Sequence, residues 1–192
     1  MFPTEALFTS TAVVALAEIG DKTQLLAIVL ATRFKRPLPI ILGILCATLA
    51  NHFLAALVGE QAASFLDGLW FRYAIAASFI LMAGWTLIPD KLDEEKEKPA
   101  RFGAFLTTLI AFFLVEMGDK TQIATIALGA RFHSVLAVMA GTTLGMMIAN
   151  VPAVFLGNAL IARVPLHVVR TVAALLFLAI GLWLLGQTAG LV

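Results

Sequence analysis

Charged residues are scarce in this chain of 192 residues. Asp, Glu, Lys and Arg together make up 13% of the sequence, whereas hydrophobic residues make up 61% and the mean hydropathy is +0.98. Because soluble domains carry about a quarter charged residues, this composition excludes an ordinary water-soluble domain and favours an integral membrane protein. The net charge of +1 shows no basic excess, so we expect no nucleic-acid partner.

Cysteine is almost absent, and a signal-peptide pattern is absent from the amino terminus. The sequence contains a single cysteine, Cys46, so it cannot form an internal disulfide. The amino terminus reads MFPTEALF and lacks the basic region that precedes the apolar core of a cleavable signal peptide. We therefore expect the first hydrophobic segment to remain in the mature protein and to span the lipid bilayer.

Long apolar runs make up most of what is present. A helix needs about 20 apolar residues to cross about 30 Å of hydrocarbon. Six segments meet this requirement, at about 6–31, 38–58, 71–89, 103–129, 134–156 and 168–188. Since backbone groups inside lipid must be hydrogen-bonded internally, the sequence predicts an all-α integral membrane protein with six transmembrane helices.

The chain also repeats itself after 98 positions. Without any gap, Glu18 aligns with Glu116, and residues 20–24 align with residues 118–122. Five further identical pairs extend the match over nearly the whole chain: Arg33 with Arg131, Gly43 with Gly141, Gly59 with Gly157, Arg72 with Arg170, and Trp85 with Trp183. We therefore expect a first three-helix repeat at 1–89, a charged cytoplasmic linker at 90–102 and a second three-helix repeat at 103–192, within one transmembrane domain.

A repeat of three spans ends on the side opposite its start, so the second copy must be inserted upside down. Inverted repeats are typical of secondary transporters, which bind their substrate near the midplane between the halves. Lys and Arg residues are concentrated on one side, with only Arg72 and Arg131 in the loops of the other. The positive-inside rule then predicts that both termini lie outside and that the central loop is cytoplasmic.

Ionisable residues lie in the middle of two of these apolar runs. They occur in AEIGDKTQ, which begins at Ala17, and in VEMGDKTQ, which begins at Val115. A charge facing lipid at this depth costs several kcal/mol, so these groups must face one another or water. On a continuous helix Glu18, Asp21 and Lys22 would share one face, because they are three and four residues apart.

Pairing of the two motif faces would gather four carboxylates and two ammonium groups. The predicted metal ligands are Glu18, Asp21, Glu116 and Asp119, and the supporting cations are Lys22 and Lys120. If all are ionised, two negative charges remain, which one divalent cation or two protons would neutralise. This balance is typical of a cation/proton exchanger, and oxygen ligands favour Mg²⁺, Ca²⁺ or Mn²⁺. A purely structural ion-pair cluster between helices is the alternative.

The other polar motif residues receive supporting roles. Gly20 and Gly118 would lie opposite the carboxylates, where a neighbouring helix could approach closely. Four more residues point away from the carboxylate face of an ideal helix, unless it unwinds near the glycine: Thr23, Gln24, Thr121 and Gln122. We expect the glutamines to bond neighbouring helices, with direct ligation as the alternative.

Two polar residues of other spans align with each other, His52 with Asn150. A polar residue at the same place in both repeats predicts an outer layer around the cation cavity. Direct metal contact by His52 is left open, because an interhelical hydrogen bond would explain the same residue.

Two copies of E-x-G-D-K-[TS] in six spans, with an acidic loop between the halves, resemble the manganese/calcium–proton antiporter family. This family includes the Golgi manganese transporter, chloroplast relatives and short bacterial manganese exporters, and the resemblance covers essentially the whole chain. It implies export of Mn²⁺ or Ca²⁺ from the cytosol in exchange for H⁺, with no cofactor. The small size of the chain is similar to that of bacterial members, which implies the plasma (inner) membrane.

Other classes of protein remain open on the sequence alone. A small-solute exporter of the amino-acid type would have a similar six-helix architecture but would not need four buried carboxylates. An intramembrane hydrolase is disfavoured, because no nucleophile-and-base pattern accompanies His52, so we expect no enzymatic activity. An assembly protein and a homodimer are both compatible with the sequence.

Overall fold

The computed structural model describes residues 3–66, 68–88, 102–157 and 165–191. These residues form eight α-helices and no strand, which confirms the all-α prediction. The helices are α1 (Thr4–Glu18), α2 (Lys22–Phe34), α3 (Pro37–Phe65), α4 (Leu69–Thr86), α5 (Ala104–Glu116), α6 (Lys120–Phe132), α7 (Val135–Leu156) and α9 (Leu166–Thr188). The predicted linker at 90–102 falls almost entirely outside the described residues.

Four of the helices are long and apolar enough to cross a membrane: α3, α4, α7 and α9. The continuous spans predicted at 6–31 and 103–129 are wrong, because each of these segments folds as two shorter helices. α1 is followed by α2 after a break at residues 19–21, and α5 is followed by α6 after a break at residues 117–119. Both breaks fall inside the duplicated motif.

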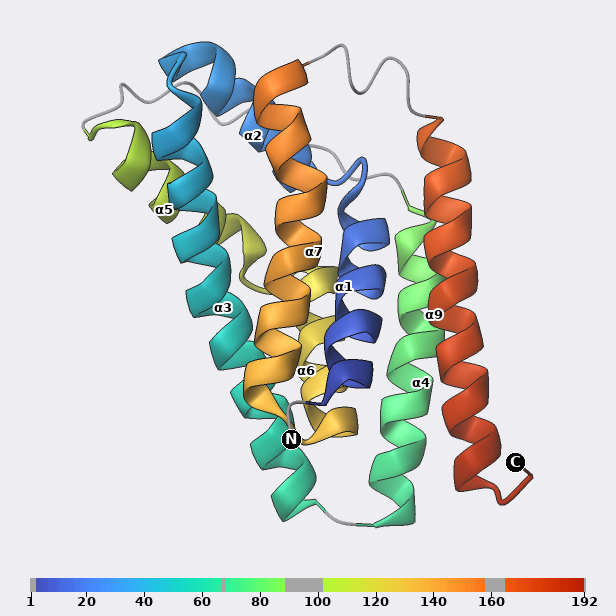
Figure 1. The fold of residues 1–192 in the computed structure, drawn as a ribbon. Helices are drawn as coiled ribbons and strands as arrows, with labels where there is room; N and C mark the ends of the chain where they lie inside the picture. The colour runs from blue at the N-terminus through green and yellow to red at the C-terminus, as the bar shows by residue number, and fades with distance from the viewer. Residues whose placement is uncertain (1–2, 67, 89–101, 158–164, 192) are drawn as a thin grey trace.

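The helix boundaries follow the sequence repeat. α2 and α6 both have 13 residues, and their first and last residues lie 98 positions apart. α3 and α7 likewise begin 98 positions apart, at Pro37 and Val135. In Figure 1, α1 begins and α9 ends at the lower end of the bundle, where α6 also ends, whereas α2 ends at the upper end.

Packing joins the two repeats rather than keeping them apart. α1 packs on α7, α3 packs on α5 and α6, and α4 packs on α9. The rings of Phe79 and Phe177, which are equivalent residues of the two repeats, lie 6.2 Å apart between α4 and α9. Large apolar side chains such as Leu81 (73% exposed) cover the outside of the bundle, as expected of a surface that faces lipid.

Candidate cation site

The duplicated motif ends one helix and begins the next. Gly20 has a φ of +82° and Gly118 a φ of +78°, a left-handed conformation that glycine adopts without strain. The side-chain oxygen of Gln24 accepts a hydrogen bond from Gly20 N at 2.9 Å, and Gln122 accepts one from Gly118 N at 2.7 Å. Both glycines lie in turns rather than on a helix face; the expected close approach of a neighbouring helix is found at Gly20, where a Cβ atom would lie 2.8 Å from Leu166 of α9, but not, among the described residues, at Gly118.

An aspartate begins each second helix. Asp21 is the N-cap of α2 and accepts a hydrogen bond from Thr23 N at 3.4 Å, and Asp119 is the N-cap of α6. A carboxylate is favoured at this place because it meets the positive end of the helix dipole. The glutamates, in contrast, are the last residues of α1 and α5. The prediction that Glu18, Asp21 and Lys22 share one continuous helix face is therefore wrong.

The threonines contact the glutamates across each break. Thr23 Oγ1 donates to Glu18 Oε2 at 2.5 Å, and Thr121 Oγ1 donates to Glu116 Oε2 at 2.9 Å. We expected these hydroxyls to lie away from the carboxylates on an ideal helix, and the break brings them back. Each hydroxyl fixes one carboxylate oxygen, while the Oε1 atom of each glutamate has no hydrogen-bond partner among the described residues.

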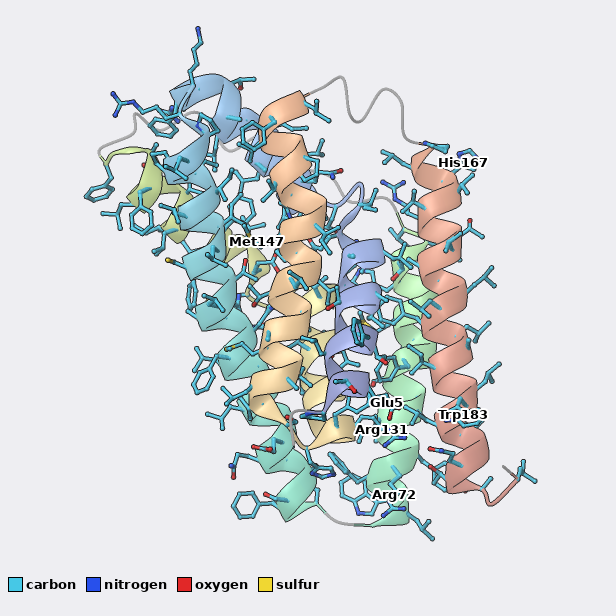
Figure 2. The ribbon with its side chains drawn as sticks, in the orientation of Figure 1. Glu5, Arg72, Arg131, Met147, His167 and Trp183 are labelled. Carbon is cyan, nitrogen blue, oxygen red and sulfur yellow. The ribbon has the colours of Figure 1, made fainter. Side chains whose placement is uncertain are left out.

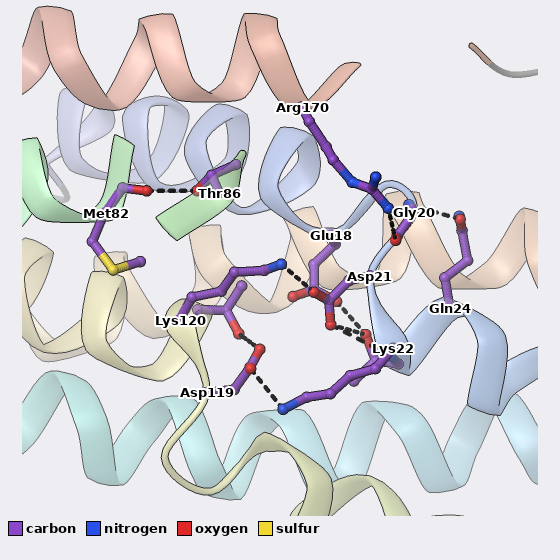
Figure 3. Close-up of polar contacts among 12 residues, drawn as sticks. Glu18, Gly20, Asp21, Lys22, Gln24, Met82, Thr86, Asp119, Lys120 and Arg170 are labelled. Carbon is purple, nitrogen blue, oxygen red and sulfur yellow. Dashed lines mark hydrogen bonds and ion pairs between the residues drawn. The ribbon is translucent and has the colours of Figure 1, made fainter. Parts of the chain in front are cut away.

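Ion pairs cross between the two motifs. Lys22 Nζ lies 2.7 Å from Asp119 Oδ1, and Lys120 Nζ pairs with Asp21 Oδ1, as Figure 3 shows. Each lysine therefore neutralises an aspartate of the other repeat. The side chain of Lys22 is 25% exposed, whereas that of Lys120 is only 3% exposed.

Three of the four predicted ligands converge on one point. Carboxylate oxygens of Glu18, Glu116 and Asp119 all lie within 4.8 Å of one another, and all three residues are buried. Oxygen ligands on opposite sides of a Mg²⁺ or Ca²⁺ ion are separated by about 4–5 Å, since each metal–oxygen distance is about 2.0–2.6 Å. The three residues could therefore hold a hard divalent cation. Asp21, which is 1% exposed, faces Lys120 instead.

The glutamines bond neighbouring helices, as expected. Gln24 Nε2 donates to the Ala149 carbonyl on α7 at 3.0 Å, and Gln122 Nε2 donates to the Asn51 side chain on α3. Ala149 and Asn51 are equivalent positions of the two repeats, so the same contact is made twice with different acceptors. Each glutamine thereby holds its turn against a long helix of the other repeat.

His52 and Asn150 are both buried. Neither ring nitrogen of His52 has a hydrogen-bond partner among the described residues. Asn150 donates to the Met146 carbonyl of its own helix at 3.1 Å, and its Oδ1 has no partner within the described part of the chain. Metal contact by either residue stays a prediction.

Sequence reasoning missed a further contact at the first turn. Arg170 Nη2 on α9 donates to the Gly20 carbonyl at 3.3 Å, as Figure 3 shows. The repeat had paired Arg170 with Arg72, but a pairing of identical residues does not reveal what either one contacts. Arg170 thus anchors α9 to the turn between α1 and α2.

A separate cavity of about 270 Å³ lies near the lower end of the bundle, between α4, α6 and α9. Its lining includes Arg72 and Arg131, which Figure 2 shows at that end, together with His133 and Gln187. The described lining contains no carboxylate. Because its charges are basic, this cavity is not the candidate cation site.

The fold and the site define a class: a helical membrane protein with a duplicated, buried cluster of carboxylates and lysines. The model of the family "Divalent cation/proton antiporter GDT1" matches residues 6–94 and 104–190. The chain belongs to this family, which confirms the resemblance inferred from the motifs. Its members are transporters, so the chain is not an enzyme.

Individual relatives agree with the family match. The chain is 50% identical over 185 residues to a Vibrio cholerae protein named "Putative manganese exporter", covering 94% of this chain and 92% of the relative. It is 31% identical to a GDT1-like protein of Synechocystis, covering 85% of this chain and 88% of that protein. It is 28% identical to GDT1-like protein 3 of Arabidopsis thaliana, covering 91% of this chain and 68% of that protein. No solved structure matches the chain.

Proposed function

We propose that this protein exports Mn²⁺ from the cytosol in exchange for H⁺, with Ca²⁺ as the alternative substrate. The membrane domain consists of six spans in two inverted three-helix repeats, 1–89 and 103–192. Two of the spans are interrupted: one consists of α1 and α2, and the other of α5 and α6. Both termini lie outside, in the plasma (inner) membrane of a bacterium. The name of the Vibrio cholerae relative supports manganese as the substrate.

The observation that carries this proposal is the crossing of the ion pairs. Lys22 neutralises Asp119, and Lys120 neutralises Asp21. Neither of these two ion pairs includes Glu18 or Glu116. Two negative charges remain, and they can be balanced by one divalent cation or by two protons. Because both glutamates are buried, either ligand must displace the other.

An aspartate carboxylate is fully available to a cation only when its lysine partner turns away. In the described geometry Asp119 already lies with the two glutamates, although Lys22 also contacts it. A divalent cation at this point would repel Lys22, which is partly exposed and can move toward water. We infer that metal binding and release are accompanied by breaking and re-forming of the Lys22–Asp119 pair. His52 and Asn150 remain in the outer layer of the site in this proposal.

The test is transport in proteoliposomes under an imposed pH gradient, with uptake of Mn²⁺ and of Ca²⁺ followed by a trapped dye. Glu18→Gln and Glu116→Gln should each lower proton-driven uptake by at least about tenfold, because each removes an ionised oxygen ligand. Glu5→Gln, the same change at an exposed position of α1, should leave uptake unchanged.

Each contrary result has a distinct meaning. Absence of metal flux from well-folded wild-type protein under either gradient direction would overturn the antiporter and favour the small-solute exporter. Flux that survives both glutamate substitutions would leave a transporter whose cation site lies elsewhere. A faster rate for Ca²⁺ than for Mn²⁺ would replace the proposed substrate with its alternative.

A further inference from the structure

One set of helix contacts is the same in both repeats. A Cβ atom added to Gly43 on α3 would lie 2.8 Å from the Phe105 carbonyl oxygen on α5. At the equivalent place a Cβ atom on Gly141 of α7 would lie 2.5 Å from the Leu7 carbonyl oxygen on α1. Both the glycines and the carbonyls are 98 positions apart. The pairs α3–α5 and α7–α1 therefore pack in the same way, as rigid units would.

A second set of contacts differs between the repeats. A Cβ atom on Gly59 of α3 would overlap the Ile126 carbonyl oxygen and lie 2.9 Å from Ala130 N, so α3 and α6 touch backbone to backbone. The equivalent of Gly59, which lies inside α3, is Gly157, the C-cap residue that follows α7 with a φ of +55°. A Cβ atom there would have no atom of the described residues within 4 Å. α2 therefore does not make at Gly157 the contact that α6 makes at Gly59.

The exposed surfaces of α6 and α2 differ in the same direction. Ala127 on α6 is 7% exposed, whereas the equivalent Val29 on α2 is 50% exposed. Ala130 is 4% exposed, whereas its equivalent, Thr32, is exposed. α6 is thus covered where α2 is open. Figure 1 shows that α6 ends at the lower end of the bundle and α2 at the upper end.

We propose that α6 and α2 are alternating gates, and that the structure represents the state in which the α6 gate is closed. In the opposite state α6 would leave α3, and α2 would close on α7 through the packing that α3 and α6 now use. The pairs α3–α5 and α7–α1 would move as rigid units, with the turns at Gly20 and Gly118 as hinges. This inference rests on the proposed transport function, and it identifies the helices that open the site to each side.

The geometry of the breaks makes this motion feasible. The backbone between α1 and α2, and between α5 and α6, is the three-residue break at 19–21 and at 117–119, so each gate helix can pivot at its first turn while its partner stays packed. The hinge glycines already have positive φ angles, which other residues rarely adopt. Because the cation ligands flank these hinges, movement of a gate changes the surroundings of the site directly.

The test uses the equivalent positions Thr32 and Ala130 as reporters. Each is changed to cysteine in a Cys46→Ser background and labelled with a water-soluble maleimide in purified protein. In the described state Thr32→Cys should react several-fold faster than Ala130→Cys. Adding Gly59→Val, whose side chain would collide with Ile126, should prevent closure of α6 and reverse this order.

Gly43→Ala is the matched control. Its added methyl would also meet a backbone carbonyl, but at a contact that both repeats share, so it should leave the order of labelling unchanged. Gly129→Ala is a milder second obstruction of the α3–α6 contact, since its Cβ would lie 2.5 Å from the Ala56 carbonyl oxygen. Gly129→Ala serves as the test variant if Gly59→Val does not give monodisperse protein.

Unchanged labelling in a monodisperse Gly59→Val or Gly129→Ala variant would overturn the proposal, because the difference between the repeats would then be permanent. A simultaneous rise at both reporters would also overturn it, since that result indicates local unfolding. Failure of the proposed transport function would look different. If Gly59→Val reverses the labelling but the wild-type protein carries no metal flux, the gate proposal stands and the proposed substrate is wrong.

Discussion

The turn at Gly20 is buried and the turn at Gly118 is exposed, although the motifs around them are nearly identical. Both turns have the same backbone, the same glutamine cap and the same threonine–glutamate hydrogen bond. What differs is whether a neighbouring helix covers the turn. Leu166 of α9 would lie 2.8 Å from a Cβ atom on Gly20, whereas the described residues leave open space around Gly118.

The origin of this difference lies outside the motifs. The equivalent of Leu166 in the first repeat is Gly68, which has no side chain to cover a turn. Arg170 bonds the first turn, while its equivalent, Arg72, lines the cavity near Arg131. A duplicated motif therefore fixes the local geometry of a site, but the residues around it decide how far each copy is exposed.

The largest expected difference concerns the two lysines. Lys120→Met should lower the free energy of unfolding by about 3–5 kcal/mol, because it leaves the buried Asp21 without its lysine. Lys22→Met also leaves a buried aspartate, Asp119, but it should cost less, since Lys22 is 25% exposed and its removal lets water approach that carboxylate. Thermal unfolding of both variants in the same detergent measures the difference.

A double substitution serves as the control for the lysine comparison. Lys120→Met combined with Asp21→Asn should recover most of the lost stability, because the uncompensated charge is removed with its partner. Equal destabilisation by Lys22→Met and Lys120→Met would contradict the asymmetry of the two motifs.

A smaller difference is expected for the two glutamines. Gln24→Leu leaves the N–H of the buried Gly20 and the Ala149 carbonyl without their partner, which should cost about 1–3 kcal/mol. Gln122→Leu also removes the partner of the buried Asn51 side chain, but it should cost less, because Gly118 is exposed and its N–H can bond water. Thermal unfolding of the two leucine variants measures the difference. A greater loss of stability in Gln122→Leu would contradict the interpretation that the Gly20 turn depends more on its glutamine.

The smallest expected effect concerns the arginines. Arg170→Met removes one hydrogen bond of 3.3 Å to the Gly20 carbonyl and should destabilise by about 1 kcal/mol. Arg72→Met, the matched change in the other repeat, should have almost no effect because Arg72 is exposed. Hydrogen exchange at residues 19–21 would localise the change: faster exchange is expected only in Arg170→Met, and no change there would mean that Arg170 does not hold the turn.

The repeat and the composition were sufficient to predict the helical class and the duplicated polar cluster. They were not sufficient to predict the breaks at Gly20 and Gly118, because apolar residues on both sides favoured one long helix. The signal was present in Asp21 and Asp119, since an aspartate directly after a glycine is typical of a helix start. The contact of Arg170 depends on how α9 packs, which no local pattern encodes.

The crossed pairs of Lys22 with Asp119 and Lys120 with Asp21 have the form of a two-fold interface, in which each side offers the other the same two groups. One repeat alone has an aspartate and a lysine that cannot satisfy each other in this way. In the proposed inverted arrangement, a half-length chain would need two copies inserted in opposite directions, a dual-topology dimer, to form the same pairs. Within one chain the two copies can carry different residues at equivalent positions, as Leu166 and Gly68 do.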